Sequence, residues 1–69
     1  MTKPTAQAVS ELLRAAVAKL DESVRVVQGA APSEFEAYRR AVGRIMGAIY
    51  LDLLTPLYAQ YPEIDPEKA

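Results

Sequence analysis

The segment of residues 33–58, SEFEAYRRAVGRIMGAIYLDLLTPLY, constrains the fold more than any other part of the chain. Its apolar residues recur at steps of three and four, which is the period of an α-helix. We therefore expect one long helix over about residues 33–54. Apolar side chains fall on more than one side of this helix, so it needs two partners. The rest of the chain supplies one of them, and the other is expected to come from outside.

Length and composition also favour an outside partner. A chain of 69 residues has room for a single small helical domain, here residues 1–69, and its core is marginal. The sequence contains no cysteine for a disulfide and no histidine for the common zinc sites. Oligomerisation is the remaining way to stabilise so small a domain, and the 51% hydrophobic content agrees with it.

The apolar residues of the long helix divide into two stripes. The first is predicted to close against the N-terminal part of the chain and consists of Phe35, Tyr38, Val42, Ile45, Met46, Ile49 and Leu53. The second stripe combines small and large residues, and two arginines flank it. This set is the predicted interface with a partner: Gly43, Gly47, Leu51, Leu54, Tyr58, Arg40 and Arg44. Small residues four positions apart let another helix approach closely.

Residues 5–28 have the pattern of a second helix with one apolar face. Thr5 is predicted to cap it, and Gly29 is predicted to end it in a left-handed conformation. Ser33 and Glu36 form the Ser-x-x-Glu pattern of a capping box at the start of the long helix. Because the connection of residues 29–32 is short, we expect an antiparallel helical hairpin.

The pair Thr55-Pro56 is expected to interrupt the long helix, since proline removes one hydrogen bond and clashes with the preceding turn. With Thr55 as its cap, a short third helix is predicted over about residues 56–61. An acidic tail follows over residues 62–69. Tyr61 and Ile64 are the residues expected to hold this tail against the body.

Charge and hydropathy limit the classes of partner that we expect for this chain. Eight basic and nine acidic residues give a net charge of −1, which makes nucleic acid an unlikely partner. The longest mostly apolar run, residues 41–54, is shorter than the roughly 20 residues of a membrane span. Residues 1–4 lack the layout of a secretory signal. We expect a cytoplasmic protein with no membrane partner.

Three groups of residues are candidates for chemistry. Asp52 is a general acid or base, a polar contact to a partner, or a boundary residue that reaches solvent or pairs with an arginine. Arg39, Arg40 and Arg44 form a basic cluster that suits the rim of a protein interface, a nucleic acid or an anionic ligand. Core or interface roles are expected for the four tyrosines, Tyr38, Tyr50, Tyr58 and Tyr61. The sequence predicts no enzyme, no cofactor and no metal site.

Three fragments carry a resemblance: FEAYRRAVGRIMG at residues 35–47, LTPLY at 54–58 and YPEI at 61–64. Over about half its length the chain resembles small proteobacterial proteins that share an F-x-x-Y-R-R-A-V-G-x-x-M-G helix, a P-L-Y element and a P-E tail. That resemblance implies a bacterial cytoplasmic origin and no particular activity. In architecture alone, the chain is similar to the plasmid repressor-of-primer proteins, helical hairpins that dimerise into four-helix bundles.

We therefore predict an all-α antiparallel helical hairpin with a short C-terminal helical turn, which dimerises into a four-helix bundle. The predicted function is protein–protein interaction, as a self-assembling adaptor or regulatory module. The alternative is an RNA- or DNA-binding regulator that uses the basic helix face.

Overall fold

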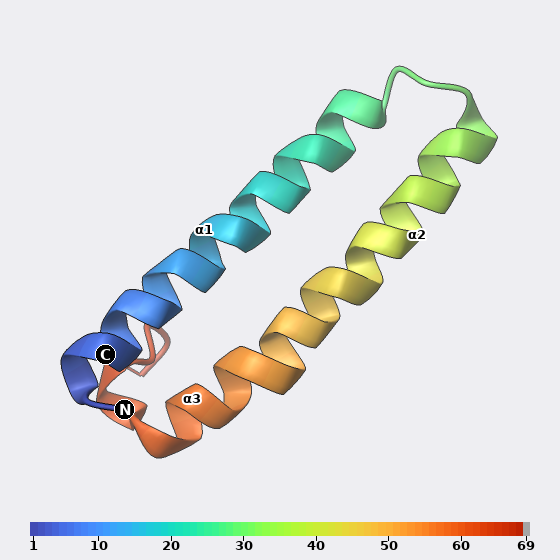
Figure 1. Ribbon diagram of the computed structural model, residues 1–69. Helices are drawn as coiled ribbons and strands as arrows, with labels where there is room; N and C mark the ends of the chain where they lie inside the picture. Colours follow the sequence, from blue (N-terminus) through green and yellow to red (C-terminus); the bar gives the residue numbers. More distant parts are fainter. Residues whose placement is uncertain (69) are drawn as a thin grey trace.

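The protein is a hairpin of two long helices, described for residues 1–68 by a computed structural model (Figure 1). Helix α1, Lys3–Val27, runs beside α2, Pro32–Ala48. The second limb continues through a π-helical turn, η1, Ile49–Leu54, and a short helix, α3, Thr55–Gln60. A 3₁₀ turn, η2, Pro62–Ile64, follows. Residues 1–68 contain no strand, so the predicted all-α hairpin is confirmed.

Both long helices begin earlier than the capping patterns predict. Helix α1 is capped by Thr2, whose hydroxyl accepts a hydrogen bond from the amide of Thr5 at 3.4 Å. Helix α2 begins at Pro32 and has no side-chain cap. The predicted caps at Thr5 and Ser33 are therefore wrong. Proline suits the first turn because its φ is already helical and it lacks one of the amide groups that a cap would have to satisfy.

The connection between the helices closes without a left-handed glycine. Gln28 keeps helical angles, and its amide donates to the Arg25 carbonyl at 3.3 Å. The amide of Ala30 donates to the Val27 carbonyl at 2.9 Å. No glycine within residues 1–68 has a positive φ, so the prediction for Gly29 is wrong. Hydrogen bonds between residues three apart tighten the end of the helix. They satisfy carbonyls that would otherwise accept hydrogen bonds from the amides of a left-handed cap.

The second limb passes through Pro56 without stopping. Leu54 and Thr55 both have helical angles, and the Thr55 amide bonds to the Tyr50 carbonyl, five residues back. The predicted cap at Thr55 is therefore wrong, whereas the short third helix predicted over about residues 56–61 corresponds to α3, Thr55–Gln60. In an α-helix the ring of Pro56 would clash with the carbonyl of Asp52, four residues earlier. The wider π turn directly before the proline relieves that clash, and the chain stays helical.

The π turn changes which side chains face α1. A helix of 3.6 residues per turn places Leu53 in the packing stripe four residues after Ile49. In the structure Leu54 is buried instead, with 1% of its surface exposed, whereas Leu53 is 50% exposed. One turn of i to i+5 geometry moves the buried position from residue 53 to residue 54. The predicted packing of Leu53 against α1 is wrong for this reason.

The main core lies at the end of the hairpin where the termini meet (Figure 1). Its buried members come from α1, η1, α3 and η2, and they are Ala6, Leu54, Leu57 and Ile64. The Tyr61 hydroxyl donates a hydrogen bond to the Met1 carbonyl, which ties the residue that follows α3 to the N-terminus. Tyr61 and Ile64 therefore hold the beginning of the tail against the body, as predicted.

A pair of hydroxyl groups joins α1 to α3 beside this core. The oxygens of Ser10 and Tyr58 are 2.6 Å apart, and the Ser10 side chain is buried. Buried hydroxyl groups cost free energy unless each finds a partner, and these two satisfy one another. The bond fixes the axial position of α3 against α1.

Replacing Leu54 by alanine tests the π turn. At a protein concentration low enough to give monomer, Leu54→Ala is expected to lower the free energy of unfolding by about 2–5 kcal/mol, because it leaves a cavity in the core. The matched Leu53→Ala removes a half-exposed side chain and should cost less than about 1 kcal/mol. Urea denaturation measures both values. An equal or larger loss for Leu53→Ala would mean that the limb keeps α-helical register.

Candidate functional site

Several large apolar side chains of the two limbs remain in solvent. Leu12 on α1 is 71% exposed, Ile45 on α2 is 52% exposed, and Leu51 in η1 is 73% exposed. Leu53 is exposed to a similar degree. Scattered apolar residues on a surface are normal, but rows of them along a helix mark interaction sites. The candidate site is therefore a surface, and the question is which side of the hairpin carries it.

The predicted interface residues do not stay together. Gly43, Gly47 and Leu51 follow one another at steps of four, and Arg40 and Arg44 next to them are exposed. We call this set the outer surface of α2. Leu54, predicted for the same surface, is instead buried in the core of the hairpin, and Tyr58, also predicted for it, is half-buried against that core. The prediction for these two is wrong because the π turn rotates them toward α1.

The two glycines of the outer surface have no packing role inside the hairpin. A Cβ atom built on Gly43 or Gly47 meets nothing within 4 Å. Glycine inside a helix costs roughly 1 kcal/mol relative to alanine because the unfolded chain loses more freedom when it orders. Neither glycine is therefore explained by contacts of this chain with itself.

Alanine at these positions should stabilise the hairpin. Gly43→Ala and Gly47→Ala are each expected to raise the free energy of unfolding by about 0.5–1 kcal/mol, since the new methyl groups enter open space. Thermal denaturation of the single and double variants measures this. A loss of stability that grows with protein concentration would instead reveal a helix from another molecule packed on the glycines.

A second surface spans both limbs and was not predicted. The Tyr38 hydroxyl donates to Ser23 Oγ at 2.8 Å, and Ser23 Oγ in turn donates to the Leu20 carbonyl at 2.6 Å. The Tyr38–Ser23 hydrogen bond lies on one side of the hairpin. Ala16 lies seven residues before Ser23, and Ile45 lies seven residues after Tyr38, so both fall on the same side.

Leu12 and Leu53 extend this surface toward the core end. Leu12 is one turn before Ala16 on α1. Eight residues separate Ile45 from Leu53, which displaces Leu53 by about 80° in a straight α-helix. The π turn rotates the chain less per residue and brings Leu53 back toward the row of Ile45. We define the side face by these six residues: Leu12, Ala16, Ser23, Tyr38, Ile45 and Leu53.

Sequence reasoning missed the side face because a single helical wheel assigned its members to the hairpin contact. Tyr38, Ile45 and Leu53 were all expected to close against α1. In the structure Val42 of that stripe is buried, whereas Ile45 and Leu53 are at least half exposed. Two helices that touch along one line leave the flanks of each apolar stripe uncovered. The sequence signal for the side face was therefore the width of the apolar stripe of the long helix, rather than the period of that stripe.

The basic cluster is partly neutralised. Arg39 Nη2 lies 2.9 Å from Glu36 Oε2, and both side chains are exposed. The hydrogen bond from Arg39, and then its charge, lowers the pKa of the Glu36 carboxyl, and the same contact raises the pKa of Arg39. Arg40 and Arg44 are left as the exposed cations one turn apart.

This ion pair gives a testable titration. Arg39→Met should raise the pKa of Glu36, because the main hydrogen bond and the nearest charge are both removed. Arg40→Met, the matched control, should move it less, since Arg40 acts on Glu36 only through its more distant charge. Because the lowered pKa favours the folded state above the carboxyl's ordinary range, this contribution disappears as the pH falls through the folded-state value. Carboxyl carbon NMR shifts follow the titration, and equal shifts in the two variants would contradict the pairing.

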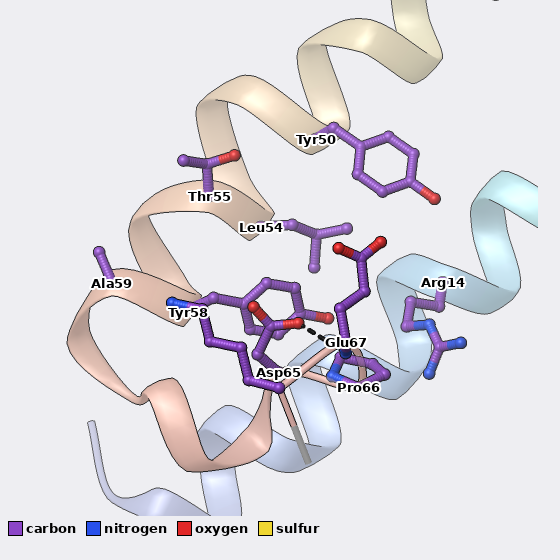
Figure 2. A pocket seen from close by; sticks show the side chains of 10 residues that line it. Arg14, Tyr50, Leu54, Thr55, Tyr58, Ala59, Asp65, Pro66 and Glu67 are labelled. Carbon is purple, nitrogen blue, oxygen red and sulfur yellow. Dashed lines mark hydrogen bonds between the residues drawn. The ribbon is translucent and has the colours of Figure 1, made fainter.

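A cleft of about 440 Å³ opens between the limbs and the tail (Figure 2). Figure 2 shows Arg14 of α1 on one side and Tyr50, Leu54 and Tyr58 of the second limb on another. The tail completes the lining with Asp65, Pro66, Glu67 and Lys68, and the Glu67 amide donates to Asp65 Oδ1 at 3.0 Å. The cleft exists only because the tail folds back against the limbs, and no periodic pattern in the sequence predicts it.

The remaining candidate for chemistry, Asp52, is an exposed residue of the π turn and does not line the cleft. Among residues 1–68, no group of three or more acidic side chains is placed to hold a metal ion. Over the same residues, no helix is both long enough and apolar enough to cross a membrane.

Comparison with protein families, with curated proteins and with solved structures finds no match for this chain. The candidate site is therefore described by its own geometry.

Proposed function

We propose that this protein is a small protein–protein interaction module that first binds a second copy of itself, forming a four-helix bundle. The observation that carries this proposal is the exposure of large apolar side chains along both limbs, at Leu12 on α1 and at Ile45 and Leu53 on the second limb. Water-facing helix sides seldom carry such rows unless another molecule covers them.

The total surface of the chain supports the same conclusion. The hairpin exposes 4909 Å². A compact monomer of 7.6 kDa is expected to expose roughly 4,300 Å² by the usual scaling with mass. The excess, roughly 600 Å², is close to the area that one partner loses in an interface of moderate size. An elongated hairpin with few buried side chains gains stability by stacking on another.

The arrangement suits contact with a partner more than chemistry on a substrate. The Ser10–Tyr58 bond and the Tyr61–Met1 bond hold the two limbs together at the end where the termini meet, so the sides of the hairpin keep a fixed shape. Such a unit can serve as an adaptor or as a regulator whose output depends on its own concentration. On the resemblance of residues 35–47 to proteobacterial proteins, we place it in the bacterial cytoplasm.

Sedimentation equilibrium tests the proposal directly. The mass is expected to rise from 7.6 kDa toward twice that value as the protein concentration passes through the micromolar range. The free energy of unfolding should increase with concentration in parallel, because association stabilises only the folded state. A folded protein that keeps the monomer mass throughout this range would overturn the homodimer.

A further inference from the structure

We infer that the second copy docks on the side face of the hairpin, and that the outer surface of α2 stays free in the dimer. This inference rests on the proposed homodimer and names the residues that form its interface. The side face is the set defined above, and its large apolar members are Leu12, Ile45, Leu53 and Tyr38.

The side face is continuous across both limbs of the hairpin. The side face includes residues of both limbs, and the Tyr38–Ser23 bond crosses between them. A partner placed there covers α1 and α2 in one contact and closes over the uncovered edge of the core between them. The outer surface of α2, which extends to Leu51 in η1, lies on the second limb alone, so a partner seated there would leave Leu12 in solvent.

The broad side of the hairpin has the size of a dimer interface. The hairpin measures 45 × 19 × 16 Å, so its broad side is about 45 Å long and 19 Å wide. That area is comparable with the roughly 800 Å² per partner that a standard interface buries. Two hairpins stacked on their broad sides give two layers of two helices, which is the arrangement of a four-helix bundle.

The side face and the outer surface of α2 differ in charge. None of the six residues that define the side face is charged, and Lys19, seven residues after Leu12 on the same side of α1, is paired with Glu22 at 3.1 Å. The outer surface of α2 instead carries Arg40 and Arg44, and Glu36, which would offset them, is held by Arg39. A twofold contact brings the same patch of both molecules together. On the outer surface it would oppose arginine with arginine, whereas on the side face it pairs apolar side chains with apolar side chains.

Matched aspartate substitutions separate the two surfaces. Ile45→Asp and Leu12→Asp place a charge in the proposed interface and should weaken dimerisation by at least about a hundredfold, because a buried charge without a partner is strongly destabilising. Leu51→Asp places the same charge on an equally exposed leucine of the outer surface and should leave dimerisation within about threefold of the wild type. Sedimentation gives the dissociation constants, and circular dichroism checks that each variant keeps its helices.

The outcomes distinguish this inference from the proposed function. A wild type that remains monomeric overturns the proposed homodimer itself. A dimeric wild type with a monomeric Leu51→Asp and a dimeric Ile45→Asp overturns only the side face and assigns the interface to the outer surface. Equal weakening by Ile45→Asp and Leu51→Asp also overturns it, since the outer surface would then not be free.

A second measurement does not depend on disruptive variants. The chain contains no cysteine, so Ile45→Cys or Leu51→Cys provides a unique labelling position. The rate of thiol labelling of Ile45→Cys should fall as protein concentration rises, whereas the rate for Leu51→Cys should stay constant. Protection of Leu51→Cys alone, or of neither variant in a sample shown to be dimeric, would refute the side face.

Discussion

The structure depends on the presence of a proline within a helix that continues past it. Pro56 lacks the amide of an α-helical bond and would press on the Asp52 carbonyl, and the π turn of η1 removes that conflict. If the limb ended there, α3 would be free to leave the hairpin. Because the limb continues, α3 reaches the N-terminal end of α1, where Leu57 enters the core and Tyr58 meets Ser10.

This constraint also explains the uneven core. Leu54, Leu57 and Ile64 gather with Ala6 at the end of the hairpin where the termini meet. Toward the connection between the helices, Val42 is the buried apolar residue, and the neighbouring contacts are made by half-buried side chains. Two helices form a line of contact rather than an enclosed interior, so the flanks of each apolar stripe remain exposed to solvent. A second pair of helices is the ordinary way to cover such flanks.

The two exposed surfaces differ in what they offer a partner. The side face is apolar and spans both limbs, and one interhelical hydrogen bond crosses it. The outer surface of α2 combines two glycines with two arginines, and the glycines meet no atoms of the hairpin. A twofold dimer favours the first surface because a self-complementary patch must tolerate its own charges. In the proposed dimer the second surface stays exposed.

The sequence by itself determined the all-helical hairpin, because apolar steps of three and four are local and a four-residue connection leaves little choice of packing. It also predicted the roles of Tyr61 and Ile64 in holding the tail. Both helix starts were missed: Thr2 rather than Thr5 caps α1, and α2 begins at Pro32 without a side-chain cap. Tertiary structure decided which side of the second limb is buried. A wheel with a fixed period cannot anticipate a π turn, which follows from a steric conflict at one proline and from the packing gained when Leu54, rather than Leu53, enters the core.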